Sequence, residues 1–316
     1  MSSLGGYPVF VKKSKGAGDR MFKPLKGKVA VVAGATRGAG RGIAVMLGAA
    51  GATVYCTGRS VRGNPSDLNR PETIEETAEM VADAGGVGIP VQVDHGDEAQ
   101  VEALFRRIGD EQNGRLDVLV NDIWGGEQLT KWGTPFWEHS LSDGLRMQER
   151  AVWTHMITSY YAAPLMVSAK KGLIIEVTDG VDYRYRGNLY YSLAKISAIH
   201  LAQAMAEELR PHHVAVLAVT PGFLRSEEML DYFGVTEANW RDAVKSGLPH
   251  AEHFMESETP YFIGRGIAAL AADPDVFMKT GQVLGSWDLA DEYGFTDVDG
   301  RKPHWGNYAK KQGFLD

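Results

Sequence analysis

The sequence has little cysteine and no net positive charge. A single cysteine, Cys56, among 316 residues excludes a disulfide framework and a cysteine-based zinc site, and it is typical of a reducing compartment. The 33 basic residues are outnumbered by 40 acidic ones, which argues against nucleic acid or an anionic membrane as a partner. No apolar run is long enough to span a membrane, and residues 1–10 lack the hydrophobic region of a signal peptide. We therefore expect a cytoplasmic enzyme or binding protein.

The composition that remains is that of a folded α/β protein. Hydrophobic residues make up 44% of the chain, which is enough for a large core. Residues 1–24 show no periodic apolar pattern and are interpreted as an N-terminal tail, and residues 25–316 are interpreted as one domain. Short apolar runs alternate with helical patterns, which predicts a doubly wound parallel sheet with helices on both faces. The expected strands are 28–33, 52–57, 88–93, 116–120, 173–178, 214–219 and 282–287.

A few residues set the expected helix boundaries. Asp97 can cap a helix whose apolar side chains recur at helical spacing. Pro71 suits a first helical turn, and Gly85 suits the end of the same helix. A helical pattern over residues 191–209 ends before Pro211, which cannot continue a helix.

The first expected strand runs directly into a glycine-rich turn that precedes a helical pattern. Glycines let a backbone approach a pyrophosphate closely, and the helix N-terminus offers free N–H donors. This context favours a dinucleotide site over a tight turn without a ligand, which is the alternative. The residues of the turn expected to bind the cofactor are Gly34, Thr36, Arg37, Gly38, Ala39 and Gly40.

The end of the second expected strand favours NADP(H) over NAD(H). An NAD site usually has an acidic residue there for the ribose 2′-hydroxyl, but this chain has Gly58 followed by Arg59. Arg37 lies in the glycine turn, and two guanidiniums suit a 2′-phosphate through charge-assisted bonds. The alternative is that both arginines are solvated surface residues.

Tyr191 and Lys195 lie four residues apart, so they share one face of the expected helix. An ammonium near a phenol stabilises the phenolate and lowers the tyrosine pKa. Tyr191 is therefore the candidate general acid or base, and the Lys195 ammonium can also hydrogen-bond a ribose hydroxyl.

Taken together, these motifs resemble the short-chain dehydrogenase/reductase family. Within it the chain is most similar to the dehydrogenase/reductase member 1 group, and the segments that carry this closer likeness are 51–59, 114–121 and 288–300. The resemblance covers residues 26–289. The elements that carry it, in the order of the family, are Gly34-x3-Gly38-x-Gly40, Asn121-Asp122-Ile123-Trp124-Gly125, Tyr191-x3-Lys195, and Pro221-Gly222 with Ser226.

The resemblance implies a Rossmann-like sheet of about seven strands, NADP(H) as cofactor, and oxidoreduction between a carbonyl and an alcohol. It also implies a homodimer or homotetramer. The further cofactor contacts that it implies are Asp94 and His95 at the adenine, Asn121, and the segment of Pro221, Gly222 and Ser226.

The sequence departs from the family at two catalytic positions. The family usually has a serine 12 or 13 residues before the tyrosine, where this chain has Asp179 and Thr178. A threonine hydroxyl can donate the same hydrogen bond, whereas an ionised aspartate cannot, so Thr178 is favoured and the role of Asp179 is left open. The usual asparagine before the fifth strand is replaced by Ala151, which alters the proton relay or lets Gln148 take part.

Aromatic insertions suggest the substrate walls. Residues 124–140 and 223–261 follow the fourth and sixth strands and favour an apolar or aromatic substrate, the alternative being a subunit interface or a satellite core. Residues 288–316 form a C-terminal extension of open function. The nine histidines show no metal-ligand spacing, so no metal is expected.

The leading hypothesis is an NADP(H)-dependent carbonyl reductase or alcohol dehydrogenase in which Tyr191 transfers the proton, Lys195 lowers the tyrosine pKa and orients the ribose, and Thr178 orients the carbonyl. A non-catalytic NADP(H)-binding regulator or assembly protein is the second hypothesis. A third is altered chemistry with Asp179 as a base.

Overall fold

A seven-stranded parallel sheet forms the centre of the protein. The computed structural model describes residues 23–65 and 69–314, so most of the expected tail (1–24) lies outside the described residues. The strand order is β3-β2-β1-β4-β5-β6-β7, as expected for a Rossmann-like sheet. The reversal between β1 and β4 creates the crevice where such sheets bind ligands. The strands are β1 (Val29–Ala33), β2 (Thr53–Gly58), β3 (Val87–Gln92), β4 (Val118–Asn121), β5 (Gly172–Val177), β6 (Val214–Thr220) and β7 (Val283–Gly285).

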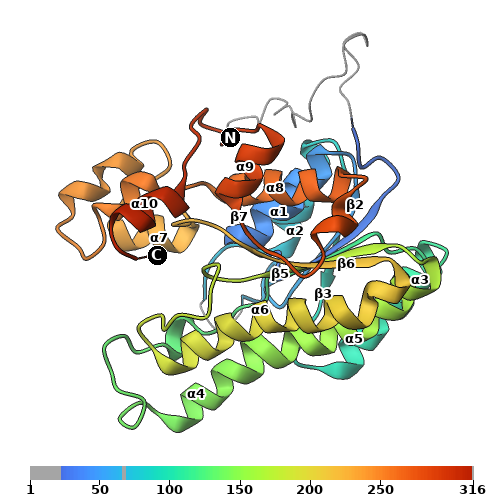
Figure 1. Ribbon diagram of the computed structural model, residues 1–316, viewed down its shortest axis with the longest axis horizontal. Coiled ribbons are helices and arrows are strands. Elements are labelled where there is room, and N and C mark those ends of the chain that lie inside the picture. Colours follow the sequence, from blue (N-terminus) through green and yellow to red (C-terminus); the bar gives the residue numbers. More distant parts are fainter. Residues whose placement is uncertain (1–22, 66–68, 315–316) are drawn as a thin grey trace.

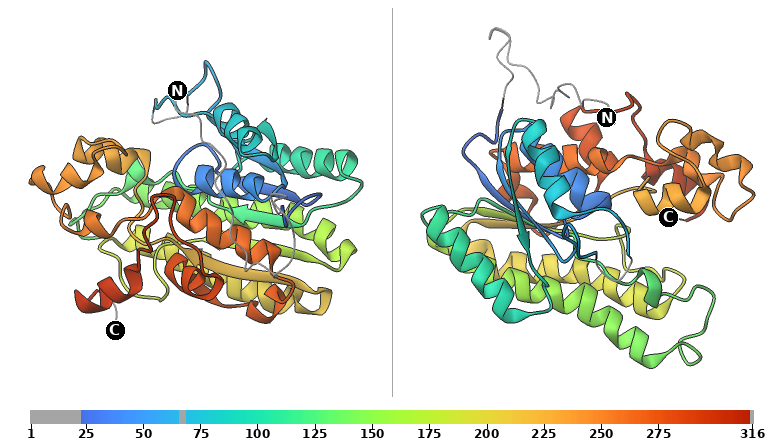
Figure 2. Two further views of the ribbon diagram at one scale, coloured as in Figure 1. Left: turned by 90° about the horizontal axis from the view of Figure 1, so that it is seen from above. Right: turned by 180° about the vertical axis from the view of Figure 1, so that it is seen from behind.

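Helices cover both faces of the sheet (Figures 1 and 2). One face carries α1 (Gly38–Ala49), α2 (Ile74–Asp83), α8 (Pro260–Ala272) and α9 (Ser286–Tyr293). The other carries α3 (Glu98–Glu111), α4 (Leu141–Gln148), α5 (Thr154–Ala169) and α6 (Leu189–Leu209).

Each face has its own apolar cluster, and β1 contributes to both. Ala30 and Val32 pack on the side of α1, while Val29 and Val31 pack on the side of α3. All five residues of β1 are buried, as expected for a strand covered on both faces.

Two expected boundaries are wrong. Pro71 precedes α2 instead of lying in its first turn, because Thr73 is the N-cap and its hydroxyl accepts from the Glu76 N–H at 3.2 Å. The last strand ends at Gly285, whose N–H donates to the Asp288 carboxylate at 3.0 Å and so begins α9. The other boundaries are confirmed at Asp97, Gly85 and Pro211.

Residues 223–261 project from the sheet and pack around a small core of their own (Figure 1). The segment contains α7 (Glu227–Phe233) and the short helices η4 (Trp240–Lys245) and η5 (His253–Glu256). The C-terminal helix α10 (Trp305–Lys311) lies beside it. Within the described ranges, no helix combines the length and the apolar character needed to cross a bilayer.

Candidate active site

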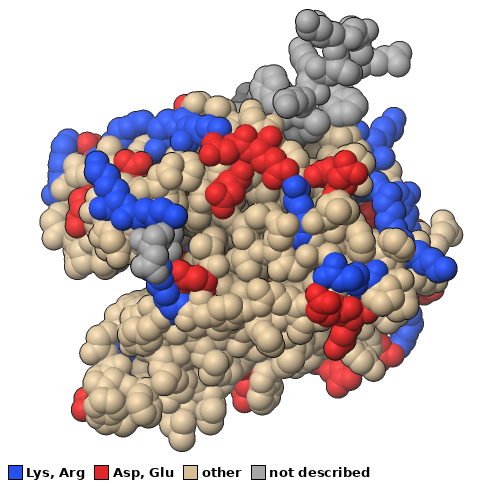
Figure 3. Space-filling model, in the orientation of Figure 1, with Lys and Arg blue, Asp and Glu red and all other residues tan. Residues whose placement is uncertain are grey.

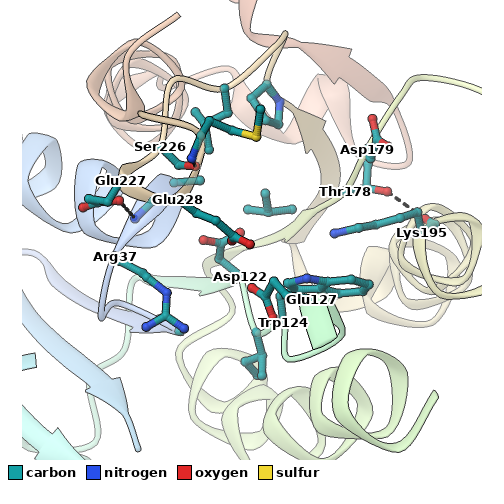
Figure 4. A pocket seen from close by; sticks show the side chains of 18 of the residues that line it. Arg37, Asp122, Trp124, Glu127, Thr178, Asp179, Lys195, Ser226, Glu227 and Glu228 are labelled. Carbon is teal, nitrogen blue, oxygen red and sulfur yellow. Dashed lines mark hydrogen bonds between the residues drawn. The ribbon is translucent and has the colours of Figure 1, made fainter. Parts of the chain in front are cut away.

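A cavity of about 1070 Å³ opens at the carboxyl ends of the strands, between the glycine turn and α6 (Figure 4). The structure brings most of the expected site residues to its wall. Two expected cofactor-binding residues, Gly40 and Asn121, do not line it. The expected residues that do are Gly34, Thr36, Arg37, Gly38, Ala39, Arg59, Asp94, His95, Thr178, Asp179, Tyr191, Lys195, Pro221, Gly222 and Ser226.

The outer glycines of the turn are required by close packing. Gly34 has φ +91°, and a Cβ there would lie 2.3 Å from the Asp122 carbonyl oxygen. A Cβ at Gly40 would lie 2.2 Å from the Gly34 carbonyl oxygen, so Gly40 lets α1 approach the strand. Gly38 has φ +55°, which favours glycine, and it lies at the cavity wall, where a Cβ would make only ordinary contacts, the shortest 3.9 Å to Ser226 Cβ.

The position of an NAD-type acid leaves no room for any side chain. A Cβ at Gly58 would lie 2.6 Å from Thr36 Oγ1 and 3.1 Å from the Ile74 side chain. Arg59 follows, and it lines the cavity together with Arg37, which is labelled in Figure 4. This end of the cavity therefore combines two arginines with the absence of an acid at position 58.

His95 is locked in the cavity floor. Its Nε2 lies 2.8 Å from Thr57 Oγ1 and its Nδ1 2.8 Å from Thr158 Oγ1. Burial lowers the pKa of His95 to about 3, so the ring is neutral at physiological pH. The neighbouring Asp94 accepts a hydrogen bond from Gly96 N. The adenine contact expected for Asp94 and His95 stays a prediction.

Asn121 belongs to a buried polar network behind the cavity. Its Nδ2 donates to Ser159 Oγ at 2.9 Å and to Glu176 Oε1 at 2.7 Å. Glu176 Oε2 lies 2.5 Å from His155 Nδ1, and His155 Nε2 lies 3.0 Å from the Ile123 carbonyl oxygen. Burial alone lowers the pKa of His155, but the Glu176 carboxylate outweighs it and the pKa is raised. The network thus supports the turn after β4 from behind the cavity. Its only signal in the sequence was Glu176, a charged residue within the apolar strand 172–177.

Tyr191 and Lys195 face the cavity from one side of α6, as expected. Asn188 caps this helix by accepting from the Tyr191 N–H at 3.1 Å. Lys195 Nζ lies 4.1 Å from the centre of the Trp124 ring and 5.6 Å from that of Tyr191. Trp124 and Trp132 meet Tyr191 edge-on, with ring centres 5.4 and 5.0 Å away.

Asp179, and not Thr178, contacts the tyrosine. The Tyr191 hydroxyl donates to Asp179 Oδ2 at 2.8 Å, whereas the Thr178 hydroxyl donates to the Lys195 main-chain carbonyl at 2.7 Å. Burial and the Asp179 carboxylate raise the pKa of Tyr191 well above 10, which corrects the expectation of a lowered value. Burial also lowers the pKa of Lys195. The Thr178 hydroxyl is thus engaged by the main chain of α6, and its role toward a substrate oxygen stays a prediction.

The chain is π-helical where the family has its asparagine. Ala151 is buried within η2 (Glu149–Trp153), a π-helical turn between α4 and α5. Gln148 does not reach the cavity, because its Nε2 donates to the Tyr190 carbonyl at 2.8 Å and supports the start of α6. The suggested participation of Gln148 in a proton relay has no geometric basis.

A buried carboxyl group supports the Pro221-Gly222 segment. Glu258 Oε2 accepts from Gly222 N at 2.9 Å and from Ser286 Oγ at 2.6 Å. Burial raises the pKa of Glu258 to about 8. Nothing in the sequence pattern singled out this residue, since its role depends on a contact between segments 36 residues apart.

Two further carboxylates that the sequence analysis did not assign lie near Lys195. Burial raises the pKa of Asp122 to about 7, although the charges of Lys195 and His155 lower it. Asp122 and Glu127 both point into the middle of the cavity (Figure 4). The charge of Glu127 raises the pKa of both Asp122 and Tyr191, so this side of the cavity is acidic.

The two aromatic insertions are only partly substrate walls. Trp124 and Trp132 line the cavity, while Phe136 and Trp137 contact each other on the surface. In the second insertion, the lining residues are Phe223, Leu224, Ser226, Glu227, Glu228, Met229, Tyr232, Pro249, His250 and His253. The other aromatic and methionine side chains form the satellite core expected as the alternative, and these are Phe233, Trp240, Phe254 and Met255.

The C-terminal extension completes the wall with Trp305 and Phe314. Within the described parts of the chain, no group of three or more potential ligands is placed to hold a metal ion.

Comparison with known proteins decides the family. The family model described as short chain dehydrogenase matches residues 28–233. The chain belongs to the short-chain dehydrogenase/reductase family. Two relatives named dehydrogenase/reductase SDR family member 1, from Mus musculus and Homo sapiens, are each 38% identical over 283 residues, covering 89% of this chain and 86% of theirs. The resemblance inferred from the motifs is confirmed.

Solved structures of the family share the fold. A short-chain dehydrogenase from Mycobacterium thermoresistibile matches with a TM-score of 0.72 and 24% identity, covering 89% of this chain and 92% of that one. A Beutenbergia cavernae protein described as an NAD(P)-dependent gluconate 5-dehydrogenase, solved with bound NADP, matches with a TM-score of 0.64 and 24% identity, covering 84% and 97%. The seven-stranded single-domain fold is thus that of a nucleotide-binding oxidoreductase family.

Proposed function

We propose that the protein is an NADP(H)-dependent oxidoreductase that interconverts a carbonyl and an alcohol on a small apolar or aromatic molecule. The observation that carries the proposal is that Tyr191 and Lys195 face the same cavity as the glycine turn. The nicotinamide, when bound, supplies or accepts the hydride, and the chain provides binding, orientation and the proton.

The residues present fit such a cofactor. The backbone of Gly38 and Ala39 borders the cavity at the N-terminus of α1, where a pyrophosphate is favoured. Arg37 and Arg59 supply positive charge for a 2′-phosphate, and Gly58 stands where an NAD site has the acid that holds a free ribose hydroxyl. These features favour NADP(H) over NAD(H).

The raised pKa of Tyr191 keeps its phenol protonated, so a proton is available for carbonyl reduction, but the neighbouring Asp179 carboxylate makes the phenol a weaker acid. Asp179 holds the Tyr191 hydroxyl at 2.8 Å and fixes its position. The Lys195 ammonium offers positive charge on the same face of α6. Trp124 and Trp132 pack edge-on against the tyrosine ring and leave it only partly exposed.

A Tyr191→Phe variant tests the proposal. It should lose carbonyl reduction while its dissociation constant for NADPH, measured by fluorescence titration, stays close to that of the wild type. Turnover at the wild-type rate would remove Tyr191 from the mechanism. An aldehyde, ketone and quinone screen in which bound NADPH is never oxidised would favour the non-catalytic regulator.

The contact of Asp179 with Tyr191 favours a second candidate, a reaction in which Asp179 acts as a base. Product analysis with deuterated cofactor separates the two candidates, because reduction transfers the label to the product and base-catalysed elimination or epimerisation does not.

Exposed apolar side chains support the proposal of a homodimer or homotetramer. The face over α4 to α6 carries few charged side chains (Figure 3), and a surface of this kind is typical of an interface. Its exposed large side chains are Leu141, Leu145, Trp153, Met156, Tyr160 and Leu193. A cytoplasmic location stays a prediction.

A further inference from the structure

The N-terminus of α1 already receives carboxylates from this chain. The Gly38 N–H donates to Glu227 Oε2 at 2.8 Å (Figure 4). The Gly40 N–H bonds to the Asp122 carboxylate. Among the described residues none accepts the N–H of Ala39, which lies between them. The first turn of α1 has three amides without a partner inside the helix, and two of them therefore bond to a carboxylate of this chain. This agrees with the preference of helix N-termini for anions.

Glu227 is held at this place by its neighbours in the chain. Arg225, only 1% exposed, lies 3.0 Å from Glu237 and 3.2 Å from Asp299 and stacks on Trp240 at 4.2 Å. Ser226 then caps α7 by accepting from Met229 N, as the residue directly before Glu227. A buried anchor two residues away thus fixes the start of α7 over the glycine turn.

The acidic side chains of α7 lie close to several arginines. Glu227 Oε1 lies 3.8 Å from Arg41 Nη1, and Asp231 Oδ2 lies 2.8 Å from Arg70 Nη2. The charges of Arg37 and Arg70 also lower the pKa of Glu228, although burial has the larger effect and raises it. An acidic helix therefore faces the arginines around the cofactor end of the cavity.

We propose that Glu227 is an internal competitor for the cofactor, occupying an anion-binding amide of α1 and opposing the approach of the pyrophosphate. The proposal rests on the proposed function for the identity of the cofactor. A pyrophosphate brings negative charge to the same helix end, so the Glu227 carboxylate either swings away or repels it. In both cases its charge weakens cofactor binding.

Glu227→Gln isolates this charge, because glutamine offers the Gly38 N–H an acceptor at the same reach. The dissociation constants for NADPH and for inorganic pyrophosphate, measured by calorimetry, should both fall about fivefold, as removal of one charge near a helix N-terminus predicts. The gain should shrink in about 1 M salt, where the screening length is about 3 Å. Glu227→Asp should retain the wild-type affinity within about twofold, since it keeps the charge.

Asp242→Asn is the matched control. It removes one negative charge from the same insertion, but Asp242 is exposed, pairs with Lys245 and does not line the cavity. If Glu227→Gln bound NADPH and pyrophosphate no more tightly than the wild type, the proposal that Glu227 competes with the cofactor would be overturned. An equal gain in affinity in Asp242→Asn would also overturn it. Absence of dinucleotide binding in every variant would instead reject the proposed function, and the pyrophosphate titration would still test Glu227.

Discussion

The hydroxyl of Tyr191 donates a 2.8 Å hydrogen bond to a carboxylate oxygen of Asp179 inside the cavity. The carboxylate contributes to the raised pKa of the phenol and disfavours negative charge on a nearby substrate oxygen. Negative charge close to Tyr191 and Lys195 therefore opposes the chemistry that their family motif suggests. Substitution of individual charged residues can test this effect.

Asp179→Ser should increase kcat/KM for ketone reduction by about tenfold or more, because a hydroxyl donor replaces a repelling carboxylate. The measurement is steady-state NADPH oxidation with a panel of ketones, together with its pH profile. Asp179→Asn also removes the charge, so it should also increase kcat/KM for ketone reduction. Loss of all activity in both variants would show that the carboxyl group itself takes part in proton transfer.

Arg37→Ala should weaken NADPH binding by about 10- to 100-fold and leave NADH binding nearly unchanged, because charge-assisted bonds of about 1.5–3 kcal/mol to the 2′-phosphate are lost. Fluorescence titration with both cofactors measures the ratio. Arg59→Ala should also weaken NADPH binding and leave NADH binding nearly unchanged. An equal loss for the two cofactors would place Arg37 at the pyrophosphate instead.

Asp122 should make folding stability depend on pH. Burial raises its pKa to about 7, whereas an unfolded aspartate has about 3.9. Between these values the folded protein holds a proton that the unfolded chain has released, so the contribution of Asp122 to the free energy of unfolding falls as pH rises from about 4 to 7.

Asp122→Asn removes that contribution. The difference in melting temperature between the variant and the wild type should grow in favour of the variant from about pH 4 to pH 7, and it should stay constant at higher pH. Parallel stability curves for the two proteins at every pH would show that Asp122 does not titrate in this range.

The buried pair of His155 and Glu176 should be sensitive to the loss of one partner. His155→Ala leaves a buried carboxylate unpaired and should cost about 3–5 kcal/mol of unfolding free energy in urea denaturation. A double variant with His155→Gln and Glu176→Gln should regain a large part of that loss. The control is Arg106→Ala, which breaks an exposed pair with Glu102 and should cost less than about 1 kcal/mol. Equal costs for the two single variants would contradict a structural role for the buried pair.

Much of the site was accessible from local patterns. The glycine turn needs a strand before it and a helix after it, and all three are contiguous in the chain, so Gly34 and Gly38 were found without a structure. Tyr191 and Lys195 are one helical turn apart, and helical geometry alone places them on one face.

The partners of these residues come from distant segments. Whether Thr178 or Asp179 contacts the tyrosine depends on how β5 meets α6, because adjacent residues at the end of a strand point to opposite sides. The reach of Glu227 to Gly38 spans 189 residues and has no periodic signal.

The sequence by itself determined the fold class, the family and the placement of Tyr191 and Lys195 on one helix face, because apolar periodicity, glycine and helical spacing act over a few residues. Only the tertiary structure decided the charge around that pair. The carboxylates of Asp122, Asp179 and Glu227 meet their partners through the packing of separate loops, and burial raises the pKa values of Asp122 and Tyr191 in a way that no local pattern encodes.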